Sequence, residues 1–536
     1  MFFNKRFAIP CSIAFAFVAT HNHFVLDRGG KVFKQSAPVI KLPEGASEDE
    51  HLDLLGVLNS STACFWLKQN CFDKGGGGIG GGIASEAWER FYEFTGTTLK
   101  DFPLPHGSTL ERARRIDSLA QELAATEPAA LLENAEPSAE LFARGEAEWN
   151  RIRALMVAEQ EELDWQVYHL YGFTESDQSL RVGEVPGIEL GERAFEIALA
   201  RRIAAGEAET AWFERHRSTP VTDIPAHLPA AYQAAVQQRL DLIAADRSLE
   251  LLERPEHKRR WSSTPWKERV REALATWILD RLENPDLWKD PNGYPQPQSI
   301  RQLAARVDTE PALAGVADAL ELWSTKRQAG VLTNLVEILK AEAVPYLATY
   351  RLKDSGLRKF AEWQRTWDAQ RAEDRGELTT DQVPVPPKYT SADFRKPSFW
   401  QARGKLDVPK ERFIAYPDAS GPDDPTPMLG WAGWDHAQQG IALVSLYDER
   451  KDDTDPDHLI PLAAGLNELL PWIRQWHSGM DAHSGLDWAD YLGGQLTSLA
   501  ERSGTPIADL PHWRPAPPTR GRKRAAARTT PSDKES

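Results

Sequence analysis

Apolar positions along the chain predict a small mixed region at the start and long helices after it. Up to about residue 45, aromatic and β-branched residues alternate with polar ones and predict short strands on either side of an Arg-Gly-Gly-Lys turn at residues 28–31. Residues 51–74 carry leucines and aromatic residues close to helical spacing, which predicts a buried helix. We therefore expect an α+β fold that is predominantly helical, with a small mixed β/α domain at the N-terminus followed by helical domains.

Turns and proline-rich stretches divide the chain into domains. Glycine and prolines at residues 96–105 close the first region, and a proline-bearing connector follows at residues 219–229. A second proline-rich break, at residues 383–388, marks a further boundary. We predict domains at residues 1–107, 108–250, 251–382 and 383–513, followed by a disordered basic tail at residues 514–536.

Composition narrows the class of protein. The chain has 536 residues, of which 41% are hydrophobic and 26% are charged, as in soluble globular proteins. No apolar run reaches the roughly eighteen residues that span a bilayer, so we expect no membrane contact and a cytoplasmic location. The start of the chain imitates a signal peptide, but Pro10 interrupts its apolar run and favours a buried strand. Three cysteines are too few for a disulfide framework or a zinc site.

Two short motifs resemble catalytic or cofactor-binding patterns without their context. Glycines at residues 75–82 match the spacing of a dinucleotide-binding turn, but they follow a helix instead of a strand, so a surface loop is the better interpretation. Asn284 and Pro285 begin a degenerate methyltransferase motif in which Asp286 and Leu287 replace the second proline and the aromatic residue. A plain turn explains this stretch better.

Several longer stretches carry a resemblance to a known family. They read FKQSAPVIKLP (residues 33–43), LLGVLNSSTACFWLKQ (54–69), ERPEHKRRW (253–261) and FWQARGKLDVPKERF (399–413). Together they resemble the C-terminal, target-recognition portion of the PglX family, the adenine-specific DNA methyltransferases of BREX type 2 phage-defence systems. The resemblance runs through nearly the whole chain, and it implies that residues 1–107 are the remnant of a DNA target-recognition domain.

The resemblance implies a division of labour. The family transfers a methyl group from S-adenosylmethionine to the exocyclic amine of adenine, but its cofactor-binding turn and its Asn-Pro-Pro-aromatic motif are not found in this sequence. We therefore expect a truncated, recognition-only chain that binds double-stranded DNA, holds no cofactor or metal, has no catalytic residue and does not methylate alone. Expected partners besides DNA are a separate chain with the methyltransferase domain and other BREX components. The alternative is a helical scaffold that docks other phage-defence components.

The strongest candidate for DNA contact is the stretch around residues 399–412. Between Arg395 and Arg412 the sequence has six basic residues and two acidic ones, which gives this stretch a net charge of +4 on a chain whose net charge is −16. Basic side chains beside aromatic rings suit a phosphate backbone. The candidates are Trp400, Arg403, Lys405, Lys410 and Arg412. A salt-bridged structural loop is the alternative.

Two further stretches are candidates for DNA contact. Lys258, Arg259 and Arg260 stand beside Trp261, which suits phosphate contact, although these charges could instead pair with the nearby glutamates at a helix start. A loop with His21, Asn22 and His23 could contact base edges or phosphate, or it could be the exposed side of a strand. The basic tail could add non-specific DNA affinity or only solubility.

Overall fold

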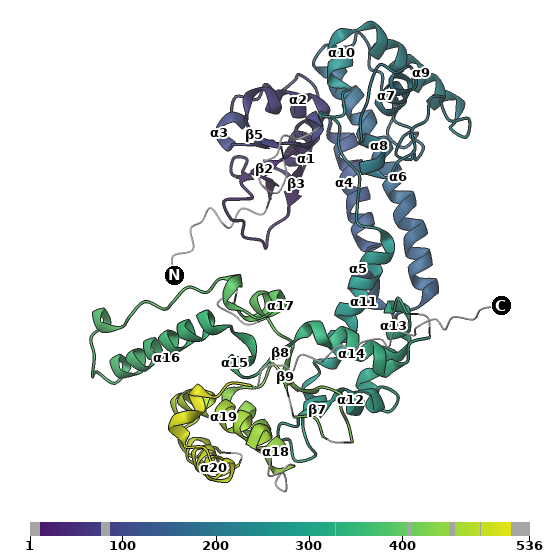
Figure 1. Cartoon of the computed structure of the whole chain (residues 1–536). Coiled ribbons are helices and arrows are strands. Elements are labelled where there is room, and N and C mark those ends of the chain that lie inside the picture. Colours follow the sequence, from purple (N-terminus) through teal and green to yellow (C-terminus); the bar gives the residue numbers. More distant parts are fainter. Residues whose placement is uncertain are drawn as a thin grey trace, which may run out of the picture. The chain divides into compact units, whose positions relative to one another are not determined.

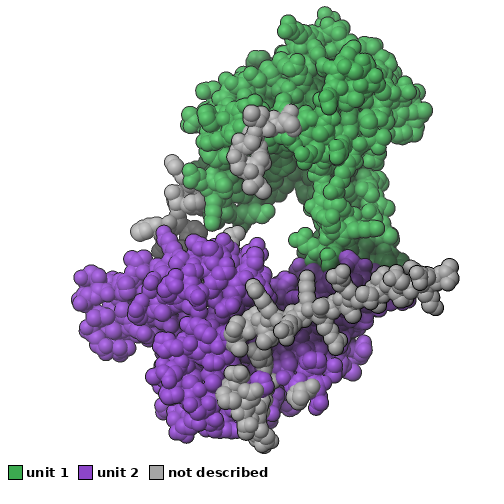
Figure 2. Space-filling view, viewed as in Figure 1, with its two compact units in different colours: residues 1–273 green, residues 274–536 purple. Residues whose placement is uncertain are grey.

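The chain forms two compact units, residues 1–273 and 274–536 (Figure 2). The computed structural model describes residues 11–76, 86–326, 328–404, 410–417, 419–421, 423–449, 456–482 and 484–515. Helices predominate in both units and each unit has small sheets, which confirms the predicted α+β, predominantly helical class. The division lies inside the predicted domain at residues 251–382, and the other predicted boundaries stay predictions.

Two small antiparallel sheets begin the first unit (Figure 1). Their strands are β1 (Ser12–Phe15), β2 (Val18–Ala19), β3 (Phe24–Asp27), β4 (Val39–Ile40), β5 (Phe72–Gly76) and β6 (Arg90–Glu93). The strand orders are β3-β1-β4 and β2-β6-β5. All four residues of β1 are buried, in agreement with the buried strand expected near the start of the chain. Ile13, Phe15 and Phe24 pack with Leu67 and Phe94 in one core.

The predicted buried helix at residues 51–74 is two helices, α1 (Glu48–Leu58) and α2 (Ser61–Asn70). The break lies at Asn59 and Ser60. The Ser60 hydroxyl accepts a hydrogen bond from the backbone N–H of Ala63 and caps α2, while the Asn59 side chain bonds both backbone groups of Phe24. Short polar side chains compete with the helix for backbone hydrogen bonds, which explains why the helix ends here.

Long helices form the rest of the first unit. They include α4 (Leu110–Ala125), α5 (Pro128–Asn134), α6 (Ala139–Leu170), α7 (Ala194–Ala204), α8 (Trp212–His216), α9 (Ala230–Ala245), α10 (Arg247–Leu252) and the start of α11 (Trp266–Leu282). The longest, α6, begins where the Ser138 hydroxyl accepts a hydrogen bond from Leu141 N–H. It packs along α4 (Figure 1), and α1 packs on α4 in turn. The small sheets are thereby joined to the helices.

The second unit combines helices with a four-stranded sheet that sequence patterns did not predict. Its strands, β7 (Gln298–Ser299), β8 (Ala343–Pro345), β9 (Phe413–Tyr416) and β10 (Met428–Trp431), pair in the order β7-β10-β9-β8, with β8 and β9 parallel. Its main helices are α12 (Ile300–Val307), α13 (Val316–Trp323), α14 (Val331–Glu342), α16 (Asp354–Asp374), α18 (His436–Asp448), α19 (Pro456–Trp476) and α20 (Trp488–Ser503). Strands this short leave little period-two pattern. Among the described residues, no helix is long and apolar enough to cross a membrane.

Candidate nucleic-acid interface

A row of buried polar side chains lies on α6 and organises the first unit. The row occupies residues 159–164, and its four acidic side chains are all buried. Unpaired buried charge is costly, so each acid needs a cation from an element that packs on α6. Three of the ion pairs are Glu159–Arg112 (2.5 Å), Glu162–Arg239 (2.7 Å) and Asp164–Lys258 (2.8 Å).

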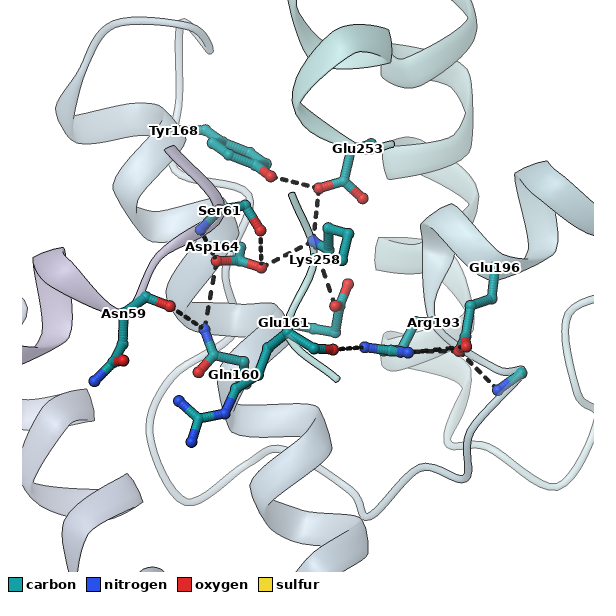
Figure 3. Close-up of polar contacts among 12 residues, drawn as sticks. Asn59, Ser61, Gln160, Glu161, Asp164, Tyr168, Arg193, Glu196, Glu253 and Lys258 are labelled. Atoms are coloured by element: carbon teal, nitrogen blue, oxygen red, sulfur yellow. Dashed lines mark hydrogen bonds and ion pairs between the residues drawn. The ribbon is translucent and has the colours of Figure 1, made fainter. Parts of the chain in front are cut away.

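Lys258 lies at the centre of this network (Figure 3). Its Nζ is 2.8 Å from Asp164 Oδ2, 2.8 Å from Glu253 Oε1 and 3.4 Å from Glu161 Oε1, and its side chain is fully buried. Burial alone would lower the pKa of Lys258, but the three carboxylates outweigh burial and raise that pKa above its ordinary value. Lys258 is therefore a buried, structural cation.

This environment corrects one sequence-based prediction. Lys258 was expected to contact phosphate, yet its exposed fraction is 0% and its ammonium group is held by three carboxylates. The alternative, in which Lys258 pairs with nearby glutamates, is correct for Glu253. Glu256 acts differently, because its backbone carbonyl accepts a hydrogen bond of 2.6 Å from Lys68 Nζ.

Hydrogen bonds connect the Lys258 network to neighbouring elements. Ser61 donates from its backbone N–H and its hydroxyl to the two oxygens of Asp164, each at 2.7 Å, which ties the start of α2 to α6. The Tyr168 hydroxyl donates to Glu253 Oε1 at 2.6 Å. Figure 3 shows these groups converging from α2, α6 and the segment after α10. The network thus fixes the backbone on which Lys258 lies.

The backbone just after Lys258 is fixed as well. Arg193 forms two hydrogen bonds of 2.8 Å with the carboxylate of Glu196 (Figure 3). It donates a third, also of 2.8 Å, to the carbonyl oxygen of Arg259. Arg153 donates to the carbonyl oxygen of Trp261 at 2.7 Å. Contacts on both sides therefore hold the segment that carries the side chains of Arg259 and Arg260.

Those two arginines join a group of basic side chains that we name the Arg259 cluster. Its members are His21, His23, Lys68, Arg259 and Arg260. Arg260 Nη1 lies 2.5 Å from the Thr20 hydroxyl, next to His21, and the rings of His21 and His23 meet edge to face at 6.1 Å. The structure thus brings together two stretches, residues 21–23 and 259–260, that the sequence singled out separately.

The Arg259 cluster holds positive charge without a paired carboxylate. Among the residues that the structure describes, Lys68, Arg259 and Arg260 form no ion pair, whereas Lys258 and Arg193 do. Burial lowers the pKa of both arginines to about 10. Burial, together with the positive charge of Arg259, lowers the pKa of His23 to about 4, so its ring is neutral at pH 7. An anion in this position would offset the unpaired charge.

Asn22 is not available for the base contact predicted for it. Its side chain is 5% exposed, and Nδ2 donates to the carbonyl oxygens of Leu58 at 2.7 Å and Ser60 at 3.0 Å. It therefore binds the carbonyl group of Leu58, at the end of α1, and that of Ser60, the residue that caps α2. His21 and His23, on either side, belong to the Arg259 cluster instead.

The basic stretch at residues 399–412 is largely neutralised within the second unit. Trp400 packs on Phe394 with ring centroids 5.5 Å apart. Arg403 pairs with Glu411, and Arg412 pairs with Asp280 and Glu283. The salt-bridged alternative therefore describes Arg403 and Arg412, because their charges are already compensated. Lys410 is exposed, and Lys405, like most of the predicted basic tail, lies outside the described residues.

Comparison with known proteins places the chain in a family. Residues 156–524 match the family described as Domain of unknown function (DUF7008). The chain belongs to this family. DUF7008 thus includes the buried acids of α6 from Glu159 onward and the segment with Lys258, Arg259 and Arg260. His21, His23 and Lys68 precede the matched residues.

The chain is also related to a named methyltransferase. It is 47% identical over 533 residues to the adenine-specific methyltransferase PglX of Streptomyces coelicolor, and the alignment covers 96% of this chain. It covers 43% of that relative, so the chain spans less than half of the relative's length. No solved structure matches this DUF7008 protein.

Sequence reasoning missed two parts of the site. In the sequence, Lys68 is a single charged position among apolar residues. Its place beside Arg260 results from tertiary packing, which the spacing of residues along the chain does not show. The acids of α6 were treated as part of an ordinary helix, although Glu161, Glu162 and Asp164 lie on more than one face of it. Four acids within six residues of one helix, on more than one face of it, are the signal that the sequence offered.

The first prediction concerns Lys258. Replacing it by Met leaves Asp164, Glu161 and Glu253 buried beside each other without a cation, and breaking a buried pair in this way costs about 3–5 kcal/mol. We expect a large fall in the apparent melting temperature of the first unit. The control is Arg151→Met, which removes a solvent-exposed pair on the same helix and should change stability little. Equal effects of the two substitutions would contradict this account.

The second prediction concerns pH. Burial and the neighbouring carboxylates raise the pKa of Glu161 from 4.5 to about 7, against the opposing effect of Lys258. Between pH 4.5 and about pH 7 the folded chain keeps a proton on Glu161 that the unfolded chain has released. The contribution of Glu161 to the free energy of unfolding therefore falls as the pH rises through this range. Glu161→Gln is neutral at every pH and should flatten the pH dependence of the melting temperature. Glu140→Gln, at an exposed position of α6, is the control and should leave it unchanged.

Proposed function

We propose that this chain is the DNA target-recognition part of an adenine-specific (N6) DNA methyltransferase of a phage-defence system. The observation that carries the proposal is the 47% identity with an adenine-specific methyltransferase, PglX, along 96% of the chain. On this proposal the chain binds double-stranded DNA in the cytoplasm. The S-adenosylmethionine needed for methyl transfer is bound by residues other than these.

Sequence and geometry around Asn284 support the absence of a catalytic role here. The printed sequence has no Asn-Pro-Pro-aromatic motif, and its nearest variant begins at Asn284. There the Asn284 side chain accepts a hydrogen bond of 3.1 Å from Asp286 N–H and caps a short 3₁₀ helix, Pro285–Trp288. Leu287 and Trp288 are buried, so no aromatic ring of this stretch is available to stack on a base.

The Arg259 cluster is the part of the described surface that best suits DNA. Phosphate contact needs positive charge that is not already compensated, and Arg259 meets this condition on a chain whose net charge is −16. Its backbone is held by Arg193, which reduces the freedom lost when the side chain binds. His23 is exposed and neutral at pH 7, so it offers a donor and an acceptor to base or sugar without adding charge.

The third prediction tests DNA binding. Arg259→Gln removes one phosphate contact and should weaken binding to duplex DNA of any sequence, and it should reduce the slope of log K against log salt by about 1. Fluorescence anisotropy at several salt concentrations measures both quantities. Arg144→Gln, at an exposed position of α6, is the matched control and should have a smaller effect. A chain that binds no duplex, but binds other proteins without salt dependence, would favour the scaffold alternative.

The fourth prediction tests whether the chain methylates DNA by itself. We expect no methyl transfer from S-adenosylmethionine to DNA by the purified chain, because no motif for binding an extruded adenine is present in its sequence. Transfer of labelled methyl groups, with an active adenine methyltransferase as the positive control, measures this. Robust methylation by the chain alone would overturn the proposed recognition-only role.

A further inference from the structure

A cavity of about 240 Å³ lies beside the Arg259 cluster, inside the first unit. Side chains of β3, α1, α4 and α6 line it, and most of them are apolar, including Phe24, Ile116 and Met156. Cavities that bind drug-sized ligands are typically about 300–1,000 Å³, so this one suits a smaller group such as a single ring system. Apolar walls and limited volume favour a flat heterocycle.

Gln160 supplies the polar group that selects the occupant. It lines the cavity, is 2% exposed, and its Nε2 donates to Asn59 O at 3.2 Å and to Asp164 Oδ1 at 3.4 Å. Both of these partners are acceptors, which fixes the orientation of the amide. Within the described residues, Gln160 Oε1 accepts no hydrogen bond. An acceptor of the cavity lining that the described residues leave without a partner favours a ligand that donates a hydrogen bond to it.

Charge at the edge of the cavity adds a second requirement. Arg259 lines the cavity together with His23, and Arg259 forms no ion pair among the described residues. The cavity's carboxylate, from Asp117, is already paired with Arg28 at 2.7 Å. A ligand that fits must therefore combine a small ring carrying an N–H donor with an anion.

We propose that this cavity binds the base of a nucleotide that carries an exocyclic amine, with the amine on Gln160 Oε1 and the phosphate on Arg259. A free nucleotide and an unpaired nucleotide within DNA share this chemistry. The DNA source rests on the proposed function, whereas the free-nucleotide source does not. The experiment therefore has one arm for each source.

The first arm uses free nucleotides and the whole chain. Isothermal titration calorimetry compares dAMP, dCMP, the 5′-monophosphate of purine 2′-deoxyriboside, whose base has no exocyclic amine and no N–H donor, and 2-deoxyribose 5-phosphate. The amine-bearing nucleotides should bind about five- to tenfold more tightly than the purine deoxyriboside monophosphate, because one hydrogen bond distinguishes them, and the sugar phosphate should bind most weakly. Equal binding of the purine deoxyriboside monophosphate or of the sugar phosphate would overturn the inference.

Two variants separate the cavity from the charge beside it. Ile116→Phe fills the cavity and should abolish the preference for dAMP while leaving Arg259 in place. Ala124→Leu adds similar bulk at an exposed position of the same helix and should leave dAMP binding unchanged. Gln160→Met removes the acceptor and should bring dAMP binding down to that of the purine deoxyriboside monophosphate, with folding checked by circular dichroism. Unchanged dAMP preference in folded Ile116→Phe would overturn the inference.

The second arm uses a short duplex that contains one unpaired 2-aminopurine, whose fluorescence rises when the base leaves the stack. The natural chain should raise this fluorescence, and Ile116→Phe should bind the duplex without raising it. Duplex binding with no fluorescence change and no dAMP binding would overturn the inference and leave the proposed function standing. Binding of dAMP without duplex binding would support the cavity as a nucleotide site and overturn the proposed DNA recognition.

Discussion

The first unit depends on one buried lysine that neutralises a cluster of acids. Lys258 faces Asp164, Glu161 and Glu253 at 2.8–3.4 Å, and this balance of one cation against three carboxylates would leave excess negative charge if all three were ionised. The raised pKa of Glu161 reduces that excess. The interaction also sets geometry, because these groups come from α6 and from the segment after α10. Ser61 extends the network to α2.

The same network explains why neighbouring basic residues differ in role. Lys258 is buried, while the next two positions carry arginines whose charge is not paired with carboxylates in the described residues. Arg193 holds the backbone between them through the carbonyl oxygen of Arg259. A rigid backbone therefore holds unpaired charge at a defined place, which is the arrangement that anion recognition requires.

Sequence patterns predicted the class of fold and singled out some residues of the candidate site. Apolar periodicity indicated the helices and the early strands, and the mixture of basic and aromatic residues indicated residues 259–260. Spacing did not show that Lys258 faces inward, because its partner Asp164 is 94 positions away along the chain. The same limit applies to Arg412, whose partners Asp280 and Glu283 precede it by 132 and 129 positions. Local charge balance therefore overestimated the free positive charge at residues 399–412.

The ion pairs of α6 also constrain the order in which the first unit is completed during synthesis. The partners of its acids lie on both sides of the helix in sequence, from Arg112 to Lys258. When α6 leaves the ribosome, Glu162 and Asp164 have no cation to meet, and burying them at that stage would be unfavourable. Burial of these two acids therefore becomes favourable only once Arg239 and Lys258 have been synthesised.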